Sequence, residues 1–130
     1  MLDRIAVHLS DISDPAEAVI EGIAYMVERL PKERFIGTLL ARGSGDALIK
    51  GVTSARSTPL AHAMLERMNV DWRAHGYDDA DLDGLAQFSL RMLQSLILDP
   101  PPKTTRTQLR AFLRRWVAPA VRATTATAER

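Results

Sequence analysis

The sequence predicts an all-α fold, an orthogonal or antiparallel bundle of about six or seven helices whose last two helices form a dimeric four-helix bundle. Three observations carry this prediction. Apolar residues recur with helical period along most of the chain, and helix-capping residues precede these segments. No segment of strand length alternates with a period of two, and no Asn-Gly or Asp-Gly pair joins two strand-like apolar runs.

Composition narrows the class of protein. The 130 residues make one domain of ordinary size, and 46% hydrophobic with 25% charged residues is typical of a globular chain. A net charge of +1 argues against a chain that binds nucleic acid or an anionic membrane through its overall field. The absence of cysteine excludes disulfides, thiolate zinc sites and cysteine nucleophiles. No secretory signal or membrane-length apolar run is present, so we expect a cytoplasmic protein without a membrane partner.

The first half of the chain predicts four helices. Residues 2–9 give a short one, and residues 14–17 (Asp-Pro-Ala-Glu) begin a longer one with an N-cap acceptor and a proline at its first position. Pro31 ends this longer helix. Residues 32–42 form a shorter helix and residues 47–53 a brief one.

The second half predicts three more. Thr58-Pro59 begins a helix that runs to about His75-Gly76, and Asp78 or Asp79 caps a long apolar helix. Residues 105–108 have a capping-box pattern for the last helix, which Pro119 kinks or ends.

The stretch from 79 to 121 organises the chain. On a helical wheel, the apolar residues of the long helix cover an arc of roughly 200°, about twice what is needed to face a single core. The last helix has an apolar stripe of its own. We therefore expect one face of each helix to pack on its own domain and another on a second copy of the chain. The predicted dimer-interface residues are Leu85, Phe88, Met92, Leu96, Phe112, Leu113, Trp116 and Val117.

The chain has no convincing catalytic motif, so we predict that it is not an enzyme. Residues 43–46 (Gly-Ser-Gly-Asp) lack the spacing of a dinucleotide-binding loop and fit a turn between helices. Asp71 and His75 are spaced to share a metal, with His62 on another face, but two ligands are too few, and solvated side chains are the preferred interpretation. We predict no metal and no cofactor. The arginines of the last helix fit a solvated face better than a phosphate-binding one.

Arg67 and the methionines leave two interpretations open. Arg67 falls inside the apolar arc of its predicted helix, where it either pairs with a carboxylate or offers a polar contact inside an apolar cavity. The methionines and aromatics on inward faces are either ordinary core or the lining of a cavity for varied apolar ligands. The candidate ligand-binding residues are Met26, Met64, Arg67, Met68, Trp72, Phe88 and Met92.

Residues 95–101 (SLILDPP) and 108–120 (QLRAFLRRWVAPA), in this order at the end of the chain, resemble the C-terminal regulatory domain of a TetR/AcrR-type transcriptional regulator. The opening, from residues 2–5 to 14–17, is similar to the helix that leaves the DNA-binding head of that family and to the start of the helix after it. The resemblance implies an all-helical domain that binds a small hydrophobic or amphipathic effector and homodimerises through its last two helices.

In that family a helix-turn-helix head precedes the regulatory domain, and nothing before Asp14 is long enough to hold one. We therefore expect no nucleic-acid contact by this chain alone. The expected organisation is an effector-binding and dimerisation domain over residues 1–122 and a disordered tail over 123–130. The alternative is a ligand-free helical module for dimerisation or scaffolding with a solid core.

Overall fold

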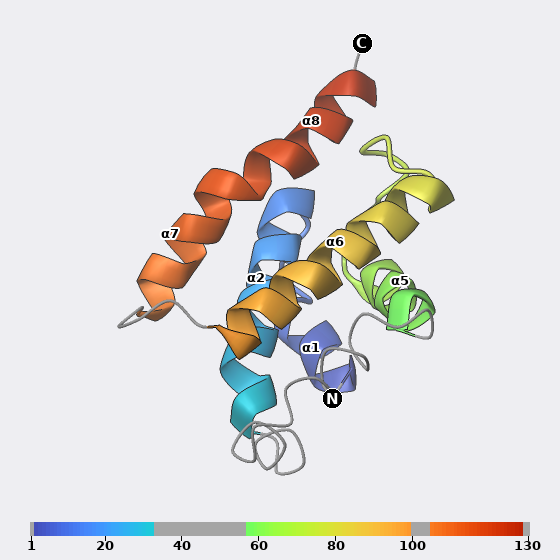
Figure 1. The fold of residues 1–130 in the computed structure, drawn as a ribbon. Helices are drawn as coiled ribbons and strands as arrows, with labels where there is room; N and C mark the ends of the chain where they lie inside the picture. The colour runs from blue at the N-terminus through green and yellow to red at the C-terminus, as the bar shows by residue number, and fades with distance from the viewer. Residues whose placement is uncertain (1, 33–56, 100–104, 129–130) are drawn as a thin grey trace.

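The computed structural model describes residues 2–32, 57–99 and 105–128, and every element in these ranges is helical, without a strand (Figure 1). The all-α prediction is confirmed. The helices expected over 32–42 and 47–53 fall almost wholly outside the described residues. The elements are α1 (Leu2–His8), α2 (Pro15–Arg29), the 3₁₀ turn η1 (Leu30–Lys32), α5 (Ser57–Arg67), α6 (Asp79–Leu98), α7 (Arg106–Trp116) and α8 (Ala118–Ala128).

Helix α2 is the centre of the arrangement. It contacts α6, α7 and α8, while α5 packs on α6 and α1 touches α5. In Figure 1, α6 runs one way past α2 and the α7–α8 pair runs back the other way, so the last helices are antiparallel. The small residues Ala18, Gly22 and Ala24 let neighbouring elements approach α2 closely, and a Cβ atom added at Gly22 would lie 3.4 Å from the Cε atom of Met68. Close packing around α2 therefore fixes the other helices.

Side-chain caps begin three of these helices, as the sequence predicts. The Asp14 carboxylate accepts a hydrogen bond of 2.9 Å from the Glu17 amide at the start of α2. Asp78 forms a reciprocal capping box with Asp81, and Thr105 forms one with Gln108. The amide hydrogen bond from Asp81 holds the pKa of Asp78 below its usual value. Such caps satisfy amide groups that the helix leaves without partners.

Helix α5 is shorter than predicted. It ends at Arg67 instead of near His75-Gly76. The buried indole N–H of Trp72 donates a 2.7 Å hydrogen bond to the Leu65 carbonyl oxygen. Gly76 then adopts a φ of 87°, a conformation that favours glycine. Trp72 thus stabilises the end of the helix rather than extending it.

The last helical segment is longer than predicted. The chain kinks at Val117, and α8 continues from Ala118 to Ala128. Pro119 lies in the first turn of α8, where a missing amide hydrogen costs no helical hydrogen bond. The expected disordered tail over 123–130 is therefore wrong for residues 123–128, which are helical.

The hydrophobic core lies around α2, between α5 and α6 on one side and α7 and α8 on the other. Its largest fully buried side chains are Leu9, Ile20, Leu82, Leu113 and Val117. The buried phenol of Tyr77 donates to the Val121 carbonyl oxygen at 2.9 Å and so links the turn before α6 to α8. No helix within the described ranges is long and apolar enough to cross a membrane.

Candidate functional site

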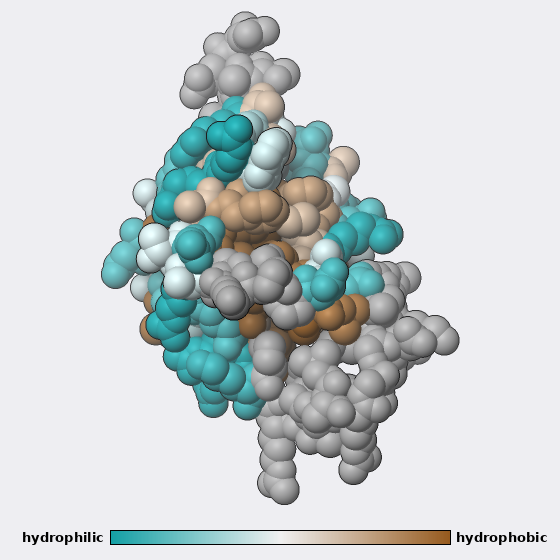
Figure 2. Space-filling view, turned by 60° about the vertical axis from the view of Figure 1, so that its left-hand side comes forward, coloured by the Kyte–Doolittle hydropathy of each residue, from teal (hydrophilic) through white to brown (hydrophobic). Residues whose placement is uncertain are grey.

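Three large side chains at the predicted interface stay exposed in the single chain. Phe88 on α6 is 40% exposed, and Phe112 and Trp116 on α7 are 45% and 62% exposed. We call these three residues the aromatic face. Figure 2 shows a hydrophobic area in the middle of one side of the molecule, with hydrophilic residues at its margins. Exposed aromatic side chains on helices at the end of the chain are typical of protein–protein contacts.

Helical geometry explains why this face is uncovered. Phe112 and Trp116 are one turn apart on α7 and lie on one flank of the buried Leu113, whereas Arg110 and Arg114 lie on the other flank. The arginine flank faces α2, as their ion pairs demonstrate. The aromatic flank therefore points away from the acidic side of α2.

The rest of the predicted interface set is less accessible. Leu96, Leu113 and Val117 are buried within their own chain, because they form the core stripe of α6 and α7. In the single chain these three side chains pack in the core, so they are not available to a partner as an exposed surface, and their part in an interface stays a prediction. Leu85 and Met92 are half-buried against the core and border the exposed Phe88 along α6.

The predicted ligand-binding residues do not form one group. Met64, Met68 and Trp72 are buried members of the core, and the Trp72 ring stacks edge-on against Tyr77 at 5.1 Å. Met26 and Met92 are partly buried against that core, while Phe88 belongs to the aromatic face. The burial of these three residues fits the core interpretation, and a role in ligand binding stays a prediction.

Arg67 has a structural partner. Its guanidinium group pairs with the carboxylate of Asp3 on α1, and the Asp3 side chain is largely exposed while that of Arg67 is about half exposed. This contact lowers the pKa of Asp3 through a hydrogen bond and charge attraction. Of the two interpretations of Arg67, the geometry supports carboxylate pairing between α1 and α5.

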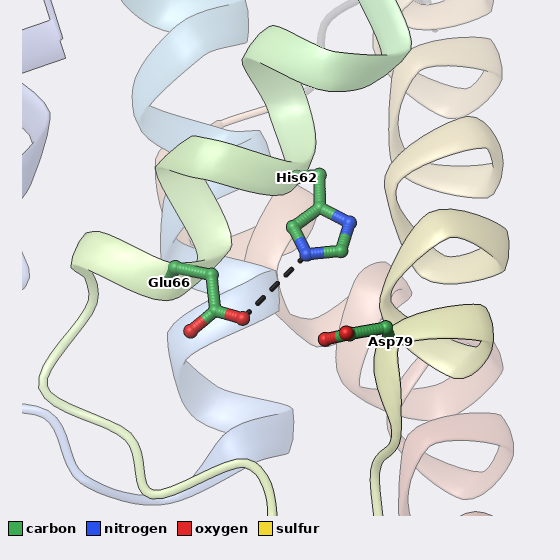
Figure 3. A group of neighbouring side chains, drawn as sticks. All are labelled: His62, Glu66 and Asp79. Atoms are coloured by element: carbon green, nitrogen blue, oxygen red, sulfur yellow. Dashed lines mark ion pairs between the residues drawn. The ribbon is translucent and has the colours of Figure 1, made fainter.

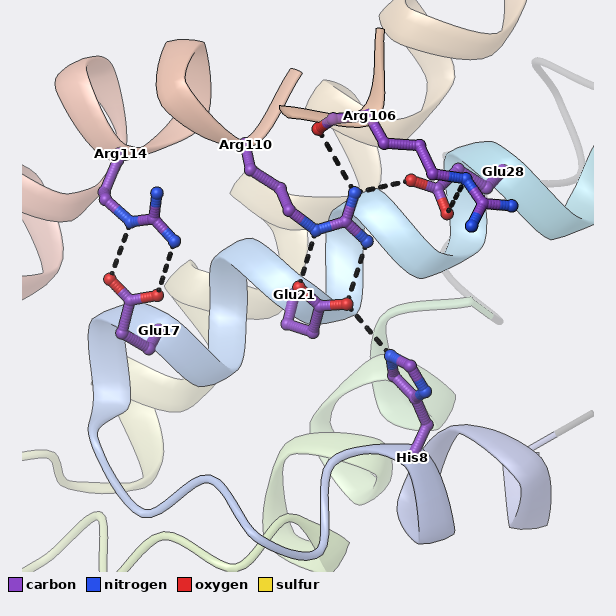
Figure 4. Close-up of polar contacts among 7 residues, drawn as sticks. All are labelled: His8, Glu17, Glu21, Glu28, Arg106, Arg110 and Arg114. Atoms are coloured by element: carbon purple, nitrogen blue, oxygen red, sulfur yellow. Dashed lines mark hydrogen bonds and ion pairs between the residues drawn. The ribbon is translucent and has the colours of Figure 1, made fainter. Parts of the chain in front are cut away.

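A network of charged side chains joins α2 to α7 (Figure 4). The Nε and Nη2 atoms of Arg110 donate hydrogen bonds of 2.8 and 2.9 Å to the two carboxylate oxygens of Glu21. Its Nη1 atom donates a third, of 2.6 Å, to the Glu28 carboxylate. Arg114 makes a second two-point contact with Glu17, at 2.9 and 3.1 Å. These two arginines are thus paired with carboxylates and are not free to bind phosphate. The glutamate–arginine network consists of Glu17, Glu21, Glu28, Arg106, Arg110 and Arg114.

Glu21 is the most perturbed acid of this network. Its side chain is about four-fifths buried and accepts hydrogen bonds from Arg110 and His8. The Arg110 hydrogen bond is the main cause that lowers the pKa of Glu21 from 4.5 to about 2. The same contact raises the pKa of Arg110 further. Both groups are therefore charged at neutral pH, and their pairing stabilises the fold.

A second polar group lies where α5 meets α6 (Figure 3). His62 and Glu66, one turn apart on α5, place Nε2 and Oε1 atoms 3.5 Å from each other. Figure 3 shows the Asp79 carboxylate, from the start of α6, pointing toward the same space, and ligand atoms of the three residues lie within 4.8 Å of one another. Asp83 and Arg73 complete what we call the α5–α6 cluster.

The contacts inside the cluster are specific. The Nδ1 atom of His62 lies 2.6 Å from the Asp83 carboxylate, which can only accept, so Nδ1–H donates. This bond is the main cause that raises the pKa of His62. Arg73 lies 2.7 Å from Asp79 and 3.5 Å from Glu66. The imidazole Nε2 atom is thus held toward Glu66 and Asp79.

The sequence did not single out this cluster. Asp71 and His75, weighed there as a metal pair, instead form a local turn in which His75 Nδ1 contacts the Asp71 backbone carbonyl. The spacing of His62 and Glu66 was the available signal, since i and i+4 side chains share a helix face. Asp79 comes from another helix and required the fold.

Comparison with known proteins adds no assignment, since no protein-family model, curated protein or solved structure matches the chain.

Proposed function

We propose that this chain is a homodimerising regulatory domain of the TetR/AcrR type, which binds a small hydrophobic or amphipathic effector. The observation that carries the proposal is the aromatic face, Phe88, Phe112 and Trp116, on antiparallel helices at the end of the chain. The similarity of residues 95–101 and 108–120 to that family supports it as well. In this proposal the partner is a second copy of the chain.

An interface of standard size would occupy only a small share of the surface of this chain. A stable dimer of standard size buries about 800 Å² on each partner. This is roughly one tenth of the 7986 Å² that the single chain exposes. Aromatic side chains are enriched at interfaces and tryptophan is among the most frequent anchors, and Leu85 and Met92 would extend the contact along α6.

A matched pair of variants tests the dimer. Trp116 and Leu60 are almost equally exposed, at 62% and 60%, but Leu60 lies on α5, outside the aromatic face. By sedimentation at micromolar concentration we expect a wild-type dimer, a monomer for Trp116→Glu, and a dimer for Leu60→Glu. A buried aromatic anchor contributes at least about 2 kcal/mol, roughly a 30-fold change in dissociation constant. A monomeric wild type, or equal dissociation by both variants, would contradict the proposal.

The effector part of the proposal has its own test. Met26 and Met92 are partly buried where α2 meets α6, and flexible methionines adapt to ligands of different shape. A thermal-shift screen with amphipathic compounds should raise the melting temperature of the wild type but not of a Met92→Glu variant. The burial of Met64, Met68 and Trp72 favours the alternative, a ligand-free dimerisation module. A dimer that no compound stabilises would support this alternative.

A further inference from the structure

We propose that the α5–α6 cluster binds one divalent transition-metal cation of the zinc class, with His62, Glu66 and Asp79 as ligands. The inference is independent of dimerisation and of any effector. It rests on the placement of an imidazole and two carboxylates from two helices around one small space (Figure 3). Imidazole with carboxylate is a donor set that zinc and its neighbours in the first transition row accept.

The distances fit a metal site before binding. Ligands at about 2.0–2.2 Å from a tetrahedral ion lie roughly 3.3–3.6 Å from one another. The Nε2 atom of His62 and the Oε1 atom of Glu66 are already 3.5 Å apart. The three donor atoms lie within 4.8 Å of each other, so the remaining adjustment falls on Asp79, whose exposed side chain can rotate.

Asp83 gives His62 the orientation that a metal requires. By accepting a hydrogen bond from Nδ1 at 2.6 Å, Asp83 directs Nε2 toward Glu66 and Asp79. Metal-binding histidines generally have such a carboxylate partner on the second ring nitrogen, which fixes the ring and increases its basicity. Asp83 is therefore a positioning residue rather than a ligand.

The charge of the cluster favours a cation. Three carboxylates, those of Glu66, Asp79 and Asp83, surround His62, and Arg73 is the guanidinium group that contacts two of them. Arg73 is largely exposed and binds Asp79 at 2.7 Å, so it can swing out when an ion enters. The site would keep open positions for water, because Glu66 and Asp79 lie at the surface. Binding would tie α5 to α6.

Calorimetric titration of the full chain with zinc chloride tests the proposal, with the absorption spectrum of added cobalt(II) as a second readout. We expect one ion per chain and an affinity at least 10-fold lower in His62→Ala. The chain has three histidines, so His75→Gln is the matched control and should bind like the wild type. Zinc should raise the melting temperature of the wild type and not that of His62→Ala.

Two further variants distinguish specific zinc binding at the α5–α6 cluster from non-specific binding of zinc to the protein surface. Asp83→Asn should lower the affinity about 10-fold while keeping one ion per chain, as expected for a partner behind the ligand. Arg73→Ala should raise the affinity, because the competing guanidinium is gone. Wild-type protein that binds no zinc, or binds it as well after His62→Ala, would overturn the proposal. An unchanged affinity in Arg73→Ala would contradict the position of the ion between Glu66 and Asp79.

Discussion

Charged side chains lie at the contact between α2 and α7 and also at the contact between α5 and α6. The two contacts differ in the balance between their positive and negative groups. The first contact matches three guanidinium groups with three carboxylates, and the pairings of Arg110 with Glu21 and of Arg114 with Glu17 are two-point contacts. In the second, the carboxylates of Glu66, Asp79 and Asp83 face one guanidinium group and one imidazole. The balanced contact needs no further partner, whereas the unbalanced one attracts a cation.

Burial separates the two regions as well. The side chains of Arg110, Glu21 and Glu28 are each about one-fifth exposed, so water screens their attraction weakly. Arg73 and Asp79 are mostly exposed, and such pairs contribute little to stability. The glutamate–arginine network is therefore suited to holding α7 on α2, and the α5–α6 cluster can exchange Arg73 for an ion at small cost.

The strongest test of the α2–α7 contact removes the apolar side chain beneath the ion pairs. Leu113 is fully buried, so Leu113→Ala should lower the free energy of unfolding by about 2–5 kcal/mol, measured by denaturant titration. Leu60→Ala makes the same chemical change at an exposed position and should change stability by less than about 0.5 kcal/mol. Equal losses would mean that α7 is not anchored through Leu113.

The next test compares one arginine from each region. Arg110→Ala leaves Glu21 and Glu28 without their main partner and should cost about 2 kcal/mol of unfolding free energy. Arg73→Ala, measured without metal, should cost less than about 1 kcal/mol because its pairs are exposed. Similar costs for the two variants would remove the distinction between a structural network and an exchangeable one.

The smallest expected effect is a change in acid sensitivity. Glu21 has a pKa of about 2 in the fold against an ordinary value of 4.5. Its stabilising contribution is complete above pH 4.5 and is lost as the pH falls toward 2, because the unfolded chain takes up the proton first. Glu21→Gln should therefore flatten the decline of the melting temperature over this range. Asp99→Asn, at the end of α6, controls for the lost charge, and a slope as steep as that of the wild type in Glu21→Gln would contradict the assignment.

Local chemistry made the helix starts predictable. Asp14, Asp78 and Thr105 are capping residues whose partners lie three residues away, so sequence alone contains the interaction. The end of α5 was not predictable in this way, because the indole of Trp72 reaches back across seven residues to the Leu65 carbonyl. Pro119 was predicted to kink or end the last helix, and α7 does end at Trp116, but the sequence did not indicate that a further helix, α8, follows.

The same difference between local and long-range interactions explains which residues of the candidate sites could be predicted. The helical wheel of α7 placed Phe112 and Trp116 at the predicted interface, and both are exposed. It placed Leu113 and Val117 there as well, but these two side chains are buried in the core. Periodicity gives the width of an apolar arc and not which part of it the rest of the chain covers. Pairs such as Arg110 with Glu21 span most of the sequence and appear only once the helices are packed.

The two tryptophans of the chain occupy opposite environments. Trp72 is sealed in the interior beside Tyr77, whereas Trp116 faces solvent beneath the guanidinium of Arg115, 5.2 Å from its ring. Iodide will therefore quench the emission of Trp116 and spare that of Trp72. The protein thus carries two native optical reporters, one for unfolding and one for whatever covers its surface, and needs no attached dye.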